Sequence, residues 1–265
     1  MEVKLVRADP AGNITLLVTS PVAPARRAAA ARALLSIPEL GGEQVGYLTA
    51  PELGGTARLE MMGGEFCGNA LRSAGFLVAR QRGSQGRTSL VMECSGCPEP
   101  LQVAADLDLG EATAQLPLPK TVTQARLCGL DLGVVVFDGI VHGILEGKPL
   151  ARDLAARATR ELADRYQADA AGLMFLRYDG GWRMDPAVYV AATDTLFFES
   201  SCASGSGAAA CYLSEEASDG VYPYAIRQPG GTIRAGVIRQ DGAPEMLTVG
   251  GAVALGEERT VELEL

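Results

Sequence analysis

Histidine is almost absent from this sequence. Among its 265 residues there is one, His142, at the end of an apolar run. Metal sites built on several histidines and acid–base mechanisms that need a histidine pair are therefore excluded. Serine–histidine hydrolysis would have to use this single residue, and no nucleophile elbow accompanies it. A histidine in such a position is more often structural than a ligand for substrate.

Positive charge and long apolar runs are scarce as well. The formal net charge is −9, and no basic patch stands out that could neutralise phosphates, so we expect no nucleic-acid partner and no anionic membrane partner. No apolar run approaches the ~20 residues that span a bilayer, and the first residues show no signal-peptide core. These features predict a cytoplasmic protein whose thiols stay reduced.

The sequence does contain an ordinary globular composition and six cysteines. Hydrophobic residues make up 48% and charged residues 21%, a balance typical of a chain that buries a core. The cysteines are Cys67, Cys94, Cys97, Cys128, Cys202 and Cys211. Cys94 and Cys97 form one C-x-x-C pair, but no histidine lies nearby and Gly96-Cys97-Pro98 is typical of a hairpin turn. We therefore expect thiols and no metal site there.

Apolar periodicity and turn residues predict an α/β order in the first half of the chain. The predicted strands are 3–9, 14–20, 44–48, 57–62, 89–93 and 101–107, and the last two form a hairpin around Gly96. The predicted helices are 24–37, which is stopped by Pro38, and 68–82, which follows Cys67. Residues 116–119 are the predicted linker.

The same order of elements starts again behind that linker. The predicted elements are a strand at 132–138, a turn at 139–143, a helix over 150–167, strands at 172–177 and 187–192, and a small-residue turn over 200–207 that opens the helix 208–216. A cysteine just ahead of a glycine-rich helix start occurs once in each half, at Cys67 and at Cys202. The repetition predicts a duplicated α/β domain with its site between the halves.

Two cysteines at helix starts suit the inversion of an amino-acid α-carbon. That reaction needs one group that removes the α-proton and a second that delivers a proton to the opposite face. The unpaired N–H groups of a helix N-terminus lower the pKa of a cysteine and also bind a carboxylate. We therefore expect Cys67 and Cys202 to be catalytic. The residues expected to bind the substrate carboxylate are Gly68, Asn69, Ala203, Ser204 and Gly205.

Several motifs are similar to those of the diaminopimelate epimerase family, and together they cover nearly the whole chain. Gly64-Glu65-Phe66-Cys67-Gly68-Asn69-Ala70 resembles the first catalytic-cysteine motif, and Cys202-Ala203-Ser204-Gly205-Ser206-Gly207 resembles the second. The turn Asp9-Pro10-Ala11-Gly12-Asn13 resembles the one whose asparagine contacts substrate, and Gln44 falls where the family has a substrate-site glutamine. Residues 229–231 and 249–252 resemble its closing segments.

The resemblance implies both a fold and a mechanism. The fold would be α/β (α+β) and diaminopimelate epimerase-like, with two pseudo-symmetric domains that each curl a sheet around a central helix. The first domain would be 1–118 with the returning strand 253–265, and the second would be 119–252. The enzyme would be a racemase or epimerase of a small-molecule amino acid that needs no cofactor and no metal, with Asn13 and Gln44 at the substrate. The sequence leaves a homodimer open.

Departures from the family pattern argue against diaminopimelate as the substrate. An Asn-Pro-His turn is replaced by Ile140-Val141-His142, an asparagine is missing near Ala170, and Glu199 is followed by serine instead of arginine. A second carboxylate would be poorly solvated at such a site. The residues around both cysteines resemble those of histidine racemases that supply D-histidine for opine-type metallophores. Glu199 or Glu65 could accept a hydrogen bond from imidazole.

Three alternatives stay open at this point. The enzyme could act on another amino acid, such as diaminopimelate or hydroxyproline. It could be a phenazine-type isomerase, although those relatives generally lack the cysteine pair. It could also be a non-catalytic small-molecule binding protein of the same fold, which would have no need for a cysteine at both helix starts.

Overall fold

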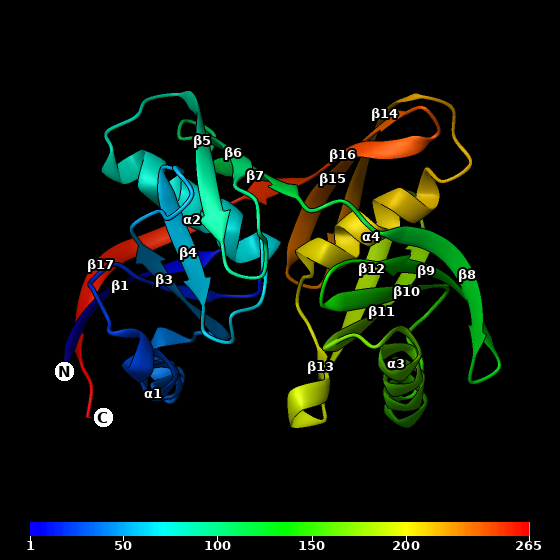
Figure 1. Cartoon of the computed structure of the whole chain (residues 1–265), viewed down its shortest axis with the longest axis horizontal. Coiled ribbons are helices and arrows are strands. Elements are labelled where there is room, and N and C mark those ends of the chain that lie inside the picture. Colours follow the sequence, from blue (N-terminus) through cyan, green and yellow to red (C-terminus); the bar gives the residue numbers. More distant parts are fainter. Residues whose placement is uncertain (265) are drawn as a thin grey trace. The chain divides into compact units, whose positions relative to one another are not determined.

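The computed structural model describes residues 1–264, which divide into two compact units. The first contains residues 1–115 and the chain from Gly250 onward, and the second contains Leu116–Val249. Both ends of the chain belong to the first unit, where the first and last strands pair (Figure 1).

The first unit is built on one curled sheet. Its strands are β1 (Glu2–Asp9), β2 (Thr15–Val18), β3 (Gln44–Thr49), β4 (Ala57–Met61), β5 (Arg87–Cys94), β6 (Leu101–Asp106), β7 (Glu111–Leu116) and β17 (Ala254–Glu262). Across the sheet they follow the order β17-β1-β2-β3-β4-β5-β6-β7. Neighbours are antiparallel except the pairs β2–β3 and β4–β5, which are parallel. The helices are α1 (Pro24–Leu35), the short 3-10 helix η1 (Pro38–Leu40) and α2 (Gly68–Gln81).

The remaining strands belong to the second unit. Its strands are β8 (Thr121–Leu127), β9 (Leu130–Val136), β10 (Ile140–Glu146), β11 (Ala170–Tyr178), β12 (Trp182–Val190), β13 (Thr195–Phe198), β14 (Gly220–Gln228), β15 (Gly231–Gln240) and β16 (Ala243–Ala252). They follow the order β8-β9-β10-β11-β12-β14-β15-β16, with the short β13 also paired to β12. The parallel pairs are β10–β11 and β12–β14. The helices are α3 (Arg152–Tyr166), the 3-10 helix η2 (Ala191–Thr193) and α4 (Ala203–Leu213).

The two units follow the same plan. In each sheet the third and fourth strands pair in parallel, and so do the fifth and sixth. A tight hairpin cannot join parallel strands, and a helix makes each of these crossovers. The crossover helices are α1 and α2 in the first unit and α3 and α4 in the second. The chain therefore has a mixed α+β fold in which one topological unit occurs twice.

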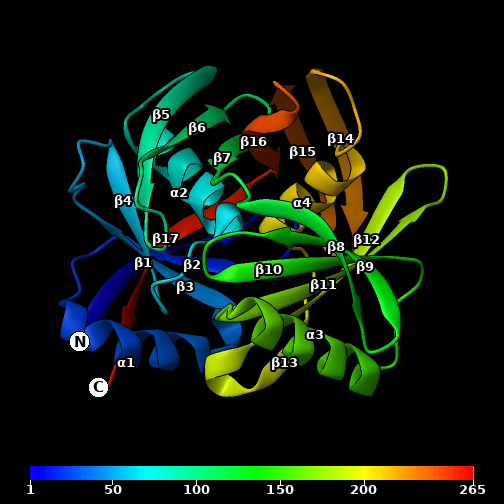
Figure 2. The same cartoon turned by 45° about the vertical axis from the view of Figure 1, so that its right-hand side comes forward.

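The second helix of each unit is buried by its own sheet. Every residue of α2 from Gly68 to Ala79 is buried, and α2 packs against β4, β5 and β6 (Figure 2). Such close packing requires small residues, because a Cβ on Gly75 would lie 2.5 Å from Val103 Cγ1. In α4 a Cβ on Gly207 would likewise lie 2.7 Å from Leu116 Cδ1. The small residues after each cysteine thus let both helices lie inside their sheets.

Most predicted elements are confirmed in the first unit, and the errors concentrate near the second cysteine. The helix after Cys67 and the hairpin around Gly96 are present as α2 and β5–β6. The turn predicted at 139–143 is wrong, because residues 140–146 form strand β10. The helix predicted over 208–216 begins already at Ala203. The strand predicted at 187–192 ends at Val190, and β14 to β16 had not been predicted.

Membrane insertion through a helix finds no support in residues 1–264, where no helix combines the length and the apolar character that crossing requires.

Candidate active site

The first unit brings Asn13, Gln44 and Cys67 together. Ala11, Gly12 and Asn13 have φ values of 65°, 86° and 59°, a left-handed path that glycine and asparagine tolerate best. The Gln44 side-chain amide donates to Asn13 Oδ1 and reaches Thr15 Oγ1 at 2.8 Å and Cys67 Sγ at 3.4 Å. A hydrogen bond donated to sulfur favours a sulfur that carries negative charge.

Cys67 is the N-cap residue of α2. Its backbone is extended, with φ −135° and ψ 108°, and its side chain makes no capping hydrogen bond to the helix. The first helical residues are Gly68 and Asn69, whose backbone N–H groups belong to the N-terminal turn of the helix. Asn69 is only 1% exposed, and its Oδ1 accepts a hydrogen bond from Arg72 Nε at 3.2 Å.

A buried arginine fixes this helix start to two other parts of the first unit. Arg72 is fully buried. Its guanidinium donates to the Pro10 carbonyl at 2.6 Å and to the Gly251 and Ala252 carbonyls at 3.1 and 3.0 Å. It therefore joins the turn of Asn13, the helix of Cys67 and the C-terminal segment. Sequence reasoning missed Arg72, because nothing local distinguishes it from an exposed helical arginine.

The C-x-x-C segment supports the chain that leads into Cys67. Ser95 Oγ donates to the Glu65 carbonyl at 2.8 Å, and a Cβ on Gly96 would lie 2.3 Å from Phe66 N. Cys94 is fully buried, and that burial raises its pKa to about 12, although the backbone N–H of Cys67 donates to it. Cys97 donates to the Glu99 carbonyl at 3.3 Å. The segment is thus a packed turn beneath Cys67.

Cys202 is the N-cap residue of α4 in the second unit. Its backbone, with φ −131° and ψ 113°, is nearly that of Cys67. Here the sulfur does cap the helix, since it accepts from the Gly205 N–H at 3.4 Å, and it lies 3.5 Å from Ser204 Oγ. The Cys202 N–H donates to Gln228 Oε1 at 2.8 Å, and Gln228 Nε2 donates to Ser206 Oγ. Gln228 is a second residue that the sequence did not reveal.

The expectation that a helix start lowers the pKa is wrong for Cys202. Burial, first, and the nearby Glu199 carboxylate, second, raise the pKa of this thiol well above its usual value. The hydrogen bonds from Ser204 and from the Gly205 N–H act in the opposite direction but do not compensate. Desolvation outweighs the helix donors because Cys202 is only 6% exposed.

His142 lies beside this second helix start. It is fully buried in β10, and its Nε2 is 3.0 Å from Ser204 Oγ. Its Nδ1 has no hydrogen-bond partner among residues 1–264. The ring edge meets Phe137, with 6.0 Å between the ring centroids. Burial lowers the pKa of His142 to about 3, so the imidazole is neutral at physiological pH.

The predicted site residues thus gather into two sets, one in each unit. The first-unit set is Asn13, Gln44, Cys67, Gly68 and Asn69. The second-unit set is Glu199, Cys202, Ala203, Ser204 and Gly205. Glu65 lies on the first-unit chain that Ser95 holds in front of Cys67.

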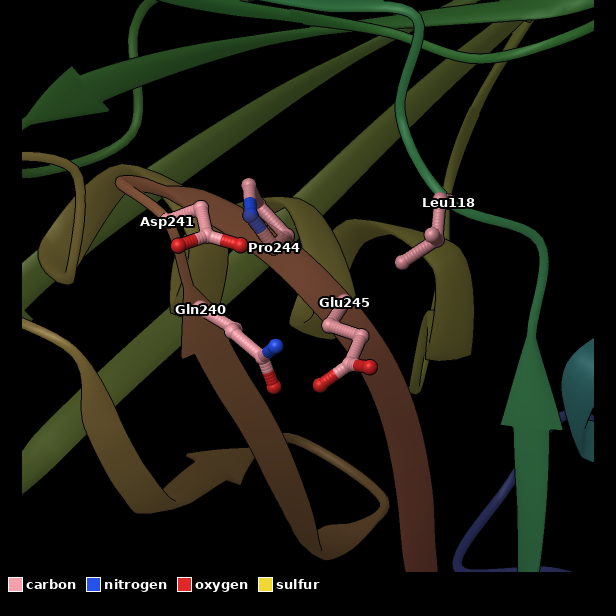
Figure 3. Close-up of a pocket in the computed structure, with 5 residues that line it drawn as sticks. All are labelled: Leu118, Gln240, Asp241, Pro244 and Glu245. Carbon is pink, nitrogen blue, oxygen red and sulfur yellow. The ribbon is translucent and has the colours of Figure 1, made fainter.

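Two other features of the described chain lack the chemistry of these sets. In residues 1–264 no three His, Cys, Asp or Glu side chains are grouped so that they could hold a metal ion. The hollow in Figure 3 is lined by Leu118, Gln240, Asp241, Pro244 and Glu245 and contains no nucleophilic side chain.

Comparison with solved structures identifies the fold as one used by racemases and other isomerases. A probable proline racemase from Agrobacterium radiobacter K84, solved with bound carbonate, superposes with a TM-score of 0.71 at 14% identity, over 99% of this chain and 93% of that one. A PhzF-family phenazine biosynthesis protein from Bacillus anthracis gives 0.70 at 14% identity, over 99% and 100%. The chain therefore shares its fold with both of these proteins.

The sequence relatives specify the family within that class. The family model "Histidine racemase CntK N-terminal domain" matches residues 2–261. A histidine racemase from Fusobacterium nucleatum subsp. nucleatum is 31% identical over 219 residues, which are 79% of this chain and 81% of that protein. The chain belongs to the histidine racemase family.

Proposed function

We propose that this protein interconverts L- and D-histidine with Cys67 and Cys202 as its two acid–base groups. The observation that carries the proposal is the repeated helix start: each unit presents a cysteine as the N-cap of a buried helix, with nearly the same φ and ψ. Membership of the histidine racemase family supports both the reaction class and histidine as the proposed substrate.

The reaction balances with two thiols and no other reactant. One sulfur, as thiolate, takes the α-proton, so that an S–H bond forms as the C–H bond breaks. The other sulfur, as thiol, gives its proton to the opposite face of the same carbon. The product leaves with inverted configuration, and the two sulfurs have exchanged protonation states. The chemistry requires that both sulfurs reach one α-carbon.

The surroundings of the sulfurs suit opposite roles at the start of a turnover. Cys202, whose pKa is raised by burial and by Glu199, would be the thiol that donates. Cys67, to which the Gln44 amide donates at 3.4 Å, would be the thiolate that accepts. The opposite enantiomer would use the two residues in reverse, after their protons have been exchanged.

The substrate carboxylate is proposed to bind the helix N–H groups of Gly68 and Asn69 and of Ala203, Ser204 and Gly205. Those N–H groups would also stabilise the charge that spreads onto the carboxylate as the proton leaves. Asn13 and Gln44 form one hydrogen-bonded pair beside Cys67 and are proposed to contact substrate. Glu199 is proposed to accept a hydrogen bond from the substrate imidazole.

Further features of the proposal come from the family resemblance. The overall architecture would be that of diaminopimelate epimerase, with domains 1–118 plus 253–265 and 119–252. The enzyme would need no metal and no pyridoxal phosphate and would work in the cytoplasm in the biosynthesis of a metallophore.

The test is chiral chromatography of purified protein with L-histidine and D-histidine, with and without a chelator. We expect both enantiomers to approach a racemic mixture in both conditions. Diaminopimelate and hydroxyproline are the comparison substrates, and efficient turnover of either beside inert histidine would overturn the substrate assignment. Absence of α-proton exchange with every amino acid tested would favour the non-catalytic binding alternative.

A further inference from the structure

A comparison of the two units shows whether the fold requires a histidine at position 142. The third residue of β2 is Leu17, which pairs with Gly46 on β3. The third residue of β10 is His142, which pairs with Gly172 on β11. Leu17 and His142 are thus equivalent, and both are fully buried against a glycine. Leucine satisfies this position in the first unit, so the fold itself does not call for histidine in the second.

A second difference between the units lies at the matching helix starts. The residue two places after the cysteine is Asn69 in α2 and Ser204 in α4. Asn69 bonds within its own helix, to Arg72. Ser204 bonds outside it, to His142 Nε2 at 3.0 Å, and its oxygen lies 3.5 Å from Cys202 Sγ. The buried histidine therefore occurs in the unit where a hydroxyl stands between it and the cysteine.

The packing of the ring settles its tautomer. A Cβ built on Gly172 would lie 2.3 Å from His142 Nδ1, so a Gly172 hydrogen points at that nitrogen. A lone pair on Nδ1 tolerates such a contact, whereas an N–H there would meet another hydrogen and remain an unpaired buried donor. The ring proton is therefore on Nε2, which donates to Ser204 Oγ. A hydroxyl has one proton, and Ser204 is left to donate it to Cys202 Sγ.

We propose that His142 is a positioning residue for Cys202: through Ser204 it directs a hydroxyl proton onto the Cys202 sulfur and stabilises its thiolate form. This inference rests on the proposed function, since it assigns His142 to the sulfur that must alternate between thiol and thiolate. It gives that alternation a physical cause, because the thiolate otherwise forms in a buried place beside a carboxylate.

In the part of the chain that the structure describes, no charged group near Cys202 and His142 stabilises the Cys202 thiolate, so the Ser204 hydroxyl has this role. Glu199 is the charged group that acts on Cys202, and its carboxylate disfavours the thiolate. Burial alone lowers the pKa of His142, so no charged neighbour among residues 1–264 governs it. The donors that favour the thiolate are the Ser204 hydroxyl and the Gly205 N–H.

The test measures the pH dependence of Cys202 alkylation by iodoacetamide, with Cys67 in the same samples as an internal reference. His142→Leu copies the residue of the first unit, and Ser204→Ala removes the intervening hydroxyl. Both should raise the alkylation midpoint of Cys202 by about one pH unit and leave that of Cys67 unchanged. The double variant should shift no further than either single variant, because both break one chain. His142→Gln, which can keep an N–H near the Nε2 position, should restore most of the wild-type midpoint.

Two readouts separate this role from a general loss of stability. kcat should fall about tenfold in His142→Leu while KM for histidine stays within twofold, since a positioning residue acts on the chemical step. Thr159→Val, which removes a fully buried hydroxyl from α3 in the same unit, should shift neither the midpoint nor kcat. If His142→Leu does not fold, Ser204→Ala and His142→Gln decide the matter.

Each outcome bears on a distinct claim. An unshifted Cys202 midpoint in folded His142→Leu or Ser204→Ala would overturn the role of His142, even if Cys202→Ser is inactive and the proposed function stands. Full racemase activity in Cys202→Ser would overturn the proposed function itself, whatever the alkylation profiles show.

Discussion

The helix starts at Cys67 and Cys202 have nearly the same backbone, yet their sulfurs meet different surroundings. The first is half-buried and receives a hydrogen bond from the Gln44 amide. The second is buried, caps its own helix, and lies beside Glu199 and a serine bound to His142. A repeated fold can therefore place two identical groups and still differentiate them, because the side chains around each start differ. The proposed mechanism makes use of this difference, since one sulfur would accept a proton while the other would donate one.

The residues that hold the two starts also differ. Arg72, in the middle of α2, bonds three carbonyls from two distant segments. The equivalent position in α4 is Gly207, which packs against Leu116 instead. The second unit holds its cysteine through the side chain of Gln228 on β14. The two units therefore hold their cysteines in place with different side chains.

The largest expected effect on racemisation comes from replacing either cysteine. Cys67→Ser and Cys202→Ser should each lower racemisation of histidine by about 1,000-fold or more, because a serine hydroxyl is a poor acid–base group at neutral pH. Chiral chromatography at matched protein concentration provides the measurement. Cys128→Ser, at an exposed cysteine, is the control and should leave the rate unchanged. Near wild-type turnover in Cys67→Ser or Cys202→Ser would exclude that cysteine from the mechanism.

The next effect concerns the arginine that is peculiar to the first unit. Arg72→Met should lower the free energy of unfolding by about 3 kcal/mol, since it leaves buried carbonyl groups without donors. Urea denaturation followed by circular dichroism measures the change. Arg80→Met, in the last turn of the same helix and exposed, is the control, with an expected change of about 0.5 kcal/mol or less. Equal effects of the two variants would contradict the anchoring role of Arg72.

A third prediction uses the buried histidine that is peculiar to the second unit. Its pKa is about 3 in the folded protein and about 6.5 in the unfolded chain. Between these values the unfolded chain binds a proton that the native protein does not, so the free energy of unfolding falls as pH falls below about 6.5. From pH 7.5 to pH 5 the loss due to His142 should be about 2 kcal/mol.

Urea titrations of wild type and His142→Gln at both pH values isolate this contribution. The difference between the two proteins should change in favour of the variant as the pH is lowered. A difference that does not depend on pH would mean that His142 has the same pKa in the folded protein as in the unfolded chain, and the lowered pKa would be wrong.

The smallest expected effect comes from a substitution that removes the negative charge beside Cys202. Glu199→Gln should lower the pKa of the Cys202 thiol, because the carboxylate that disfavours the thiolate is gone. The pH midpoint of Cys202 alkylation should fall by about one unit, opposite in sign to the shift expected for His142→Leu. Glu216→Gln, an exposed carboxylate just after α4, should cause no shift. A rise in the midpoint would contradict the electrostatic account.

Local sequence signals predicted a helix behind each cysteine, although the second was predicted to begin at residue 208 instead of Ala203. They did not predict the contacts that hold the two helix starts. The glycine-rich segments after Cys67 and Cys202 signal close packing, and both helices are found there. The segment between Gly139 and Gly143 was predicted as a turn, whereas residues 140–146 form strand β10. The bonds of Arg72 to Gly251 and of Cys202 to Gln228 join distant parts of the sequence. A single sequence contains no periodicity that would reveal them.

The central claim is that two sulfurs handle the α-proton on opposite faces, and isotope incorporation at early times tests it most directly. The protein is incubated in D₂O with L-histidine, and separately with D-histidine, and both enantiomers are isolated before a tenth of the substrate is converted. The account predicts that the product enantiomer carries deuterium, delivered by the exchanged thiol, while the recovered substrate keeps its proton. Product that retains the substrate proton, or substrate that gains deuterium as fast as product forms, would indicate a single base and contradict the two-cysteine mechanism.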